Sequence, residues 1–190
     1  MESILIVSSS EKNTKVLKDL IISRTSLTIN IAASGEEAKI KILKNSYQLI
    51  LISGPLLDCT IEDLALFLSE STISGIIVLL NSQCTKDSTL KLQEEGIVIL
   101  HSPLKPSSLF HGIESGIAMN KRLLRLKKEN NKIQKKLQDL QLIFRAKLIL
   151  MEHFTFNEEE AHKFLQKRAM DMRQSLEETA EDIIAVYGKH

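Results

Sequence analysis

The sequence predicts an α/β protein, with a doubly wound (βα)5 domain followed by a long coiled-coil helix and a small three-helix unit. Five short apolar runs recur between Ile4 and Leu100, and a segment with helical spacing separates each run from the next. Buried parallel strands read as continuous apolar runs. Their alternation with helices predicts a parallel sheet covered on both faces. A third observation, a heptad pattern after Ser107, predicts the long helix.

The expected strands and helices alternate strictly. The apolar runs are 4–7, 27–32, 49–52, 76–80 and 97–100, and the helical segments between them are 11–23, 35–43, 61–68 and 86–95. Ser10 and Ser34 stand where each could cap the helix that follows it. Gly75 and Gly96 stand where a helix passes into a strand. We therefore expect the first domain to occupy residues 1–117.

From Ser107 onward the pattern becomes helical, with Pro106 suited to the first turn. Apolar residues and one asparagine then fall on alternating steps of four and three, which is the contact seam of a dimeric coiled coil. The seam residues are Met119, Leu123, Leu126, Asn130, Ile133, Leu137, Leu140 and Phe144. We expect a homodimerisation helix over 118–144. The alternative is an ordinary amphipathic helix that packs against its own first domain.

Two short helices should follow the long one. Asn157 with Glu160 has the spacing of a capping box, and Ser175 can cap a last helix. The middle helix should bury Ala161, 164–165, 168–169 and Met172. The last helix should bury Leu176, Ala180, 183–184 and Tyr187. Together with the end of the long helix they predict a compact three-helix domain over 137–190.

Composition excludes several classes of protein. The net charge of +1 does not fit a uniformly basic coat for nucleic acid, but eight cations stand against Glu129 alone between residues 121 and 136. This stripe is a candidate electrostatic footprint, and a solvated coiled-coil surface is the alternative. Cys59 and Cys84 lack metal-ligand spacing, so we expect buried or half-buried thiols and no metal or cofactor. Because no apolar run suits a signal peptide or a membrane span, we expect a cytoplasmic protein with no membrane contact.

Residues 1–117 resemble the receiver domain of response regulators, a flavodoxin-like fold. Receivers carry phosphorylation chemistry at the ends of their strands, and each position differs here. Ser8 and Ser9 replace the acidic pair that holds Mg²⁺, and Ser53 replaces the phosphoacceptor aspartate. Leu80 replaces the hydroxyl residue, and Ser102 replaces the lysine before a proline. We interpret these five residues as a degenerate phosphorylation site.

The chemical consequence is a pseudo-receiver that does not switch by phosphorylation. A hard divalent cation needs carboxylate oxygens, and without the lysine no cation neutralises the phosphoryl oxygens. A shifted register with Asp58 as acceptor would place 54–55, Gly-Pro, inside a central strand, so we reject it. Using Lys105 as the missing lysine would place Pro103 inside the last strand, and we reject it for the same reason. Control would instead come from a sensor protein or a ligand at this domain.

The last part of the chain carries a second resemblance. Arg145-Ala-Lys and Leu150-Met151, then Glu159-Glu-Ala161, Leu165 with Ala169-Met170, and Leu176 with Ala180 look like the ANTAR domain of transcription antitermination regulators. The resemblance covers about 137–187. Two positions depart from the family pattern, since Leu148 stands in place of a glycine and Gln166 in place of an arginine. We expect the first to affect helix packing and the second to remove one RNA contact.

The resemblance implies a dimer that binds tandem stem-loops in the leader of a nascent mRNA and prevents a terminator hairpin from forming. Lys163 and Lys167 are four residues apart on the middle helix and should project together. Unpaired bases and loop phosphates are the usual target of sequence-specific RNA readers. The RNA-binding candidates are Arg145, Lys147, Lys163, Gln166, Lys167 and Met170. Solvated surface charges are the alternative for each cation, and the acidic last helix should face away from RNA.

The sequence thus predicts an antiterminator that is not an enzyme, because no nucleophile–base pair, phosphate loop or carboxylate dyad has usable spacing. The rival interpretations are a working phosphorelay regulator, a DNA-binding regulator with the same dimer rod, and an adaptor that only dimerises. An acidic last helix disfavours the second, and the serine at position 53 disfavours the first.

Overall fold

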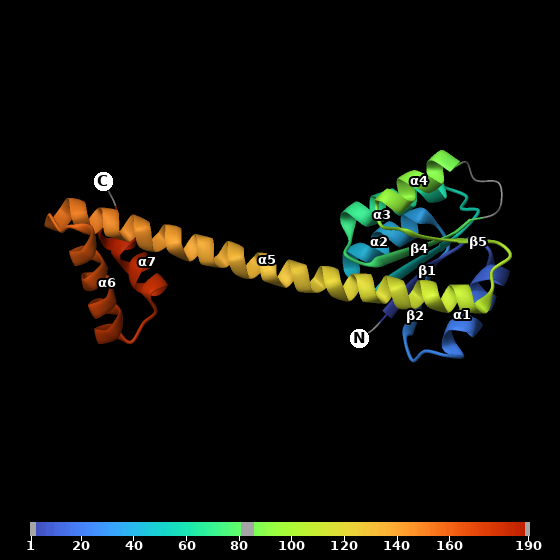
Figure 1. Cartoon of the computed structure of the whole chain (residues 1–190), viewed down its shortest axis with the longest axis horizontal. Coiled ribbons are helices and arrows are strands. Elements are labelled where there is room, and N and C mark those ends of the chain that lie inside the picture. Colours follow the sequence, from blue (N-terminus) through green and yellow to red (C-terminus); the bar gives the residue numbers. More distant parts are fainter. Residues whose placement is uncertain (1–2, 81–85, 189–190) are drawn as a thin grey trace. The chain divides into compact units, whose positions relative to one another are not determined.

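The computed structural model describes residues 3–80 and 86–188. Its contacts divide the chain into two compact units, residues 1–126 and 127–190. Figure 1 labels the helices and strands of both units. Among the described residues, no helix combines the length and apolar character that crossing a membrane requires. The prediction for Cys84 falls outside the described residues, while Cys59 is a half-buried free thiol.

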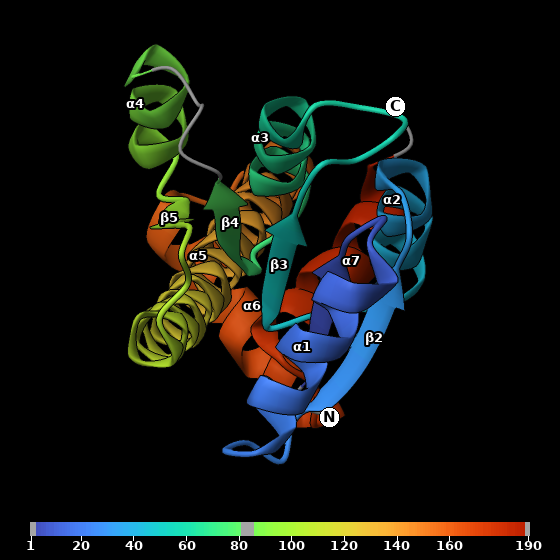
Figure 2. The same cartoon turned by 90° about the vertical axis from the view of Figure 1, so that its right-hand side faces the viewer.

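Unit 1 has the predicted alternation of strands and helices. The strands are β1 (Ser3–Val7), β2 (Thr28–Ala32), β3 (Leu49–Ser53), β4 (Gly75–Leu80) and β5 (Val98–His101). The helices between them are α1 (Glu11–Ile22), α2 (Gly35–Lys44), α3 (Ile61–Ser71) and α4 (Lys86–Glu94). All strand pairs are parallel, in the order β2-β1-β3-β4-β5 (Figure 2). The doubly wound fold class is therefore confirmed.

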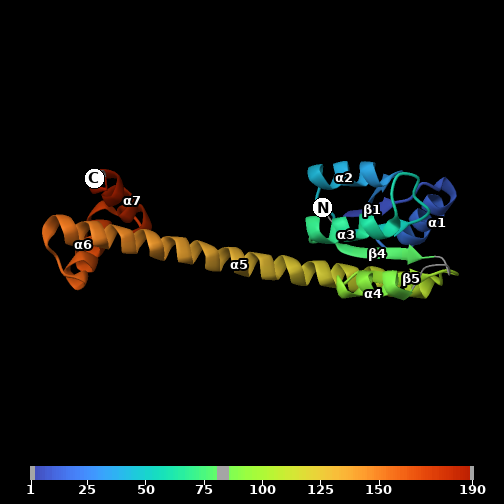
Figure 3. The same ribbon diagram turned by 90° about the horizontal axis from the view of Figure 1, so that it is seen from above.

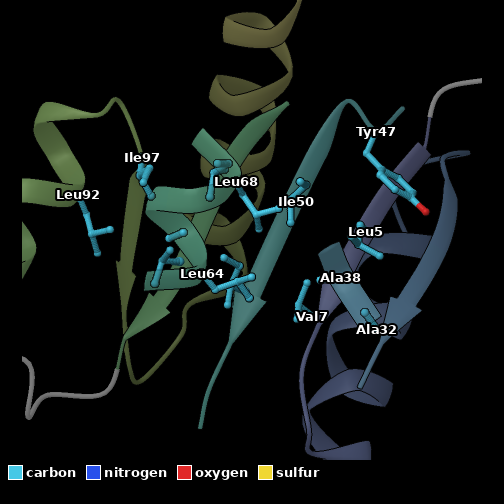
Figure 4. Packing of buried hydrophobic residues seen from close by; sticks show 14 of the residues in the cluster. Leu5, Val7, Ala32, Ala38, Tyr47, Ile50, Leu64, Leu68, Leu92 and Ile97 are labelled. Carbon is cyan, nitrogen blue, oxygen red and sulfur yellow. The ribbon is translucent and has the colours of Figure 1, made fainter. Parts of the chain in front are cut away.

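Helices cover both faces of this sheet. On one face, alternate strand residues such as Leu5, Val7 and Ile50 pack against Ala38 of α2 and Leu64 of α3, as Figure 4 shows. On the other face, Ile4, Ile6 and Leu51 pack against α1 and the start of α5 (Pro106–Phe154). Residues 4–7 and 49–52 are fully buried, which explains why these strands read as unbroken apolar runs.

The first part of α5 is fitted closely to unit 1. A side-chain Cβ at Gly75 would lie 2.3 Å from the carbonyl oxygen of Gly116, so these backbones approach as only glycine permits. Asn120 is buried and donates from its side-chain nitrogen to the carbonyl of Ile73 at 2.7 Å. These contacts carry α5 past residue 117, where we expected the first domain to end.

Unit 2 contains the rest of α5 with α6 (Glu158–Met172) and α7 (Leu176–Tyr187), which lie against the end of α5 in Figure 3. Both predicted caps form complete capping boxes, Asn157 with Glu160 and Ser175 with Glu178. The core is built from the predicted small residues of all three helices and from larger apolar ones. Its fully or nearly fully buried members are Ala146, Leu150, Ala161, Leu165, Ala180 and Ile183.

One detail of the predicted packing was wrong. Met172, expected on the buried side of α6, is 57% exposed, because the helix ends there and Arg173 turns the chain with φ 56°. Most seam residues of α5 are exposed in the single chain. Only Met119 and Leu123 line a small cavity of unit 1. The exposed seam residues beyond them are Leu126, Asn130, Ile133, Leu137, Leu140 and Phe144.

Candidate nucleic-acid interface and degenerate phosphorylation site

The five receiver-like positions gather at the carboxyl edge of the sheet. Ser8 and Ser53 follow paired residues of neighbouring strands and are both buried. The hydroxyl of Ser9 donates to the carbonyl of Pro55. Leu80 is buried at the end of β4, and its carbonyl accepts a hydrogen bond from the backbone N–H of Ser102 at 3.0 Å. Ser53, Leu80 and Ser102 line one cavity with Lys12 and Asn13 of α1.

The register places Ser53 at the end of the third strand, as predicted. Since β3 ends at Ser53, Gly54 and Pro55 lie outside the strand. Asp58, the alternative acceptor, is engaged elsewhere. Its carboxylate accepts hydrogen bonds from the backbone N–H groups of Gly35 at 3.1 Å and Glu36 at 2.9 Å, and these bonds lower its pKa.

The residues of this edge do not fit a magnesium ion. None of the described residues that line the cavity carries a carboxylate. Nor do three His, Cys, Asp or Glu side chains of the described ranges gather closely enough to hold a metal. Lys105 follows the end of β5 by four residues and is not part of the cavity wall. Serine hydroxyls and one lysine cannot replace the charge that a hard divalent cation needs from its ligands.

The candidate RNA-binding residues of α6 share one exposed side of that helix. Lys163, Gln166, Lys167 and Met170 are all exposed, and Met170 is 79% exposed. Steps of three and four residues bring these side chains together. The opposite side of α6 is buried through Ala161, Leu165 and Ala169. The structure therefore brings together the four candidates from the middle helix.

Acidic residues of the first turn of α6 pair with two of the candidate cations. Lys147 of α5 contacts Glu158 at 2.6 Å, and this cation lowers the pKa of the Glu158 carboxyl. Lys163 contacts Glu159 at 2.7 Å, four residues earlier on the same helix. Lys167 makes no ion pair within the described part of the chain. The Lys163–Glu159 pair is exposed on both sides and is therefore weak, so a phosphate group can displace this glutamate at little cost. The side chain of Lys147, by contrast, is largely buried.

Arg145 and Lys147 lie on different sides of α5. Positions that are two residues apart on a helix, such as 145 and 147, are separated by about 200° around its axis. Because Ala146 between them is fully buried, their side chains flank the buried side of α5 on opposite edges. Lys147 flanks α6 through Glu158, whereas Ile149 and His153 contact the end of α7. Arg145 is therefore on the α7 side.

Three features of unit 2 were not foreseen. His162 lies beside Gln166, with 3.1 Å between the Nε2 atoms, so it belongs to the edge of the candidate surface. Lys147 also lies over the ring of Phe144 at 5.8 Å. The rings of Phe154, Phe156, Phe164 and Tyr187 form a cluster with centroids 5.5–6.1 Å apart. The sequence does show aromatic residues at both ends of the 154–164 segment. Their spacing alone did not predict that these rings contact one another.

Several solved structures share the fold of unit 1. A two-component response regulator from Clostridium difficile is 25% identical, with a TM-score of 0.56, and the match covers 65% of this chain and 98% of that one. A CheY-like receiver domain from Methanospirillum hungatei is 18% identical, with a TM-score of 0.58, and covers 64% and 98%. A structure described as adenylate cyclase from Rhodopirellula baltica, 20% identical with a TM-score of 0.61, covers 69% and 97% and shows the fold alone. No curated protein matches the chain.

Unit 1 thus has the fold of response-regulator receiver domains. Residues 131–184, the end of α5 with α6 and nearly all of α7, match the family model of the ANTAR domain. The chain therefore carries an ANTAR domain behind a domain with the receiver fold, and the predicted resemblance is confirmed. Of the two departures from the family pattern, Leu148 is 43% exposed and so does not disturb the helix contacts.

Proposed function

We propose that the protein is a transcription antiterminator, whose dimer binds tandem stem-loops in a nascent mRNA leader and prevents a terminator from forming. The ANTAR domain carries this proposal, because it presents Lys163, Gln166, Lys167 and Met170 together on the exposed side of α6. Two cations beside an amide and a thioether suit loop phosphates and unpaired bases. The seam of α5 would hold two such surfaces in one molecule.

Control would not pass through phosphate. The carboxyl edge of the receiver fold offers serine hydroxyls where a metal and an acyl phosphate need carboxylates. A sensor protein or a small ligand at this domain would therefore set the activity. A phosphorelay regulator is the second candidate by fold, but the chemistry of Ser53 speaks against it. A DNA-binding role finds less support, since the outer side of α7 carries Glu178, Glu181 and Asp182.

The test is charge reversal on α6. Lys163→Glu with Lys167→Glu should weaken binding to a two-hairpin leader RNA by at least tenfold in low salt. It should also reduce the salt slope by about 1–2, since two phosphate contacts are lost. Binding is measured by fluorescence anisotropy between roughly 50 and 200 mM salt.

The matched control is Lys15→Glu with Lys18→Glu, two exposed lysines of α1 that undergo the same change of charge. If both double variants lose the same affinity, the effect is one of total charge, and the assignment of the α6 surface is wrong.

A further inference from the structure

The degenerate phosphorylation site contains a cavity of about 320 Å³. It is walled by α1, by the residues after β3, and by the ends of β4 and β5. Ligands of doubly wound proteins bind outside the carboxyl ends of the strands, and pockets for small organic molecules begin at about this volume. The cavity therefore has the place and the size of a ligand site.

The walls are more apolar than a phosphoryl group requires. Val16, Leu79, Leu100 and Leu104 line the cavity, and Leu80 stands where receivers have a hydroxyl residue. A phosphate group could contact the polar wall residues Lys12, Asn13 and Ser53, but it has no apolar surface to place against these side chains. An organic body of a few carbon atoms would instead bury apolar surface there.

The polar groups of the cavity define the charge of its ligand. Among the wall residues that the structure describes, Lys12 is the lysine, it makes no ion pair within the described ranges, and no described carboxylate lines the cavity. Ser53 is 6% exposed, lines the cavity, and makes no hydrogen bond from its side chain to any described residue. A buried hydroxyl normally has a partner, so this group is available to a ligand. Asn13, His101 and the hydroxyl of Ser102 also line the cavity, so a carboxylate would find several hydrogen-bond partners beside the ammonium of Lys12.

We propose that this cavity binds a small organic carboxylate with an apolar body, and that this ligand takes the place of the phosphoryl group. The inference deepens the proposed control through unit 1. The carboxylate would accept hydrogen bonds from the ammonium of Lys12 and the hydroxyl of Ser53, with the apolar body against Leu79 and Leu100.

The same cavity wall contacts α5, which gives the ligand a route to regulation. Leu100 and Leu104 belong to the core that holds Leu109 and Ile113 of α5. A Cβ at Gly112 of α5 would lie 3.2 Å from a methyl of Leu100, so this leucine has little room to move without α5. A ligand that fixes Leu100 thus favours one placement of the first turns of α5 within unit 1.

The test uses the full chain with ¹³C-labelled leucine and valine methyl groups. Benzoate and hexanoate are titrated as carboxylate probes, benzyl alcohol as a neutral probe, and inorganic phosphate as an anion without an apolar body. The proposal predicts that both carboxylates shift the methyl signals of Val16, Leu79, Leu100 and Leu104 and saturate below roughly 5 mM. Benzyl alcohol and phosphate should bind at least about tenfold more weakly.

Substitutions at two exposed wall residues test the proposed contacts of the ligand with the cavity. Lys12→Gln should weaken carboxylate binding about tenfold, whereas Lys15→Gln, the matched control on the same helix and outside the cavity, should leave it unchanged. Val16→Asp should abolish binding by placing a negative charge in the wall. A thermal melt of each variant confirms that it is folded.

Three results would overturn the proposal. These are no saturation by either carboxylate, equal binding of phosphate, and equal binding of benzyl alcohol. None of them bears on the leader-RNA measurement, which is made without ligand. Failure of this inference is therefore distinguishable from failure of the proposed function.

Discussion

Position 53 shows how one side chain decides what chemistry a receiver fold can perform. Ser53 ends the central strand β3 and is 6% exposed, and Ser8 follows the last residue of the neighbouring strand β1. At this depth a carboxylate is tolerated only with strong compensation by cations or metal. Serine avoids that desolvation cost altogether. The loss of the acidic residues at the neighbouring strand ends is thus consistent with an edge that no longer holds a metal.

Ser53→Asp should therefore fail to restore phosphorylation. The variant lacks the acidic pair and the lysine, because Ser8, Ser9 and Ser102 remain. Acetyl phosphate with Mg²⁺ should give no acid-labile mass adduct in the variant or in the unaltered protein. The buried charge should lower the free energy of unfolding by about 1–3 kcal/mol, measured by urea denaturation at pH 7. Ser53→Asn, of equal size and uncharged, should lose less, and a stoichiometric labile adduct would contradict the pseudo-receiver interpretation.

Among the elements, α2 shows how a distant loop completes a helix. Ser34 caps the N-terminus by accepting from the N–H of Glu37, and Asp58 accepts from the N–H groups of Gly35 and Glu36. The loop can come this close because residue 35 is a glycine. A Cβ there would lie only 2.4 Å from the Sγ of Cys59. Asp58, the alternative phosphoacceptor considered from the sequence, thus has a structural role at a helix end.

This capping makes the stability depend on pH in a defined direction. Because the hydrogen bonds lower the pKa of Asp58 in the folded protein, its contribution is present above the ordinary carboxyl pKa of about 3.9. That contribution is lost as the pH falls through the lowered value. The melting temperature of Asp58→Ala should lie below that of the unaltered protein at pH 7, and the gap should close below about pH 4.

Circular dichroism melts between pH 2 and pH 7 measure this gap. Asp58→Asn keeps an oxygen acceptor that does not titrate, so its melting temperature should lie between the other two at pH 7. A gap for Asp58→Ala that stays constant to pH 2 would mean that the capping contact does not depend on the charge.

The elements of the fold were more predictable than the contacts of the site. The strands lie within a residue or two of their predicted bounds, because runs such as 49–52 are buried on both faces and leave a continuous apolar signal. The capping residues Asn157 and Ser175 predicted the starts of α6 and α7, because a helix cap depends only on residues close in the sequence. Periodicity does not say which neighbour lies on which flank. The side of α5 on which Arg145 lies and the pairing of Lys147 with Glu158 were therefore not predicted.

At the scale of the whole molecule, α5 belongs to both units, and its middle part has large apolar side chains without cover in the single chain. Ile133 is 67% exposed, Leu137 56% and Leu140 64%. These residues recur on the steps of a coiled-coil seam, and a second copy of the chain would cover them. The proposed reading of tandem hairpins needs this pairing, because two linked sites bind two hairpins far more tightly than separate ones do.

Leu137→Asp should therefore dissociate the dimer and lower the affinity for a two-hairpin RNA by about 10²-fold or more. Affinity for a single hairpin should change by less than about threefold, since the α6 surface is untouched. Analytical ultracentrifugation gives the oligomeric state, and fluorescence anisotropy gives both affinities.

The control is Gln138→Asp, an exposed neighbour off the seam that receives the same new charge. The two-site argument fails if Leu137→Asp is monomeric yet binds both RNAs as the unaltered protein does. If the unaltered protein is itself monomeric at micromolar concentration, the exposed seam has another partner, and the antitermination proposal loses its geometric basis.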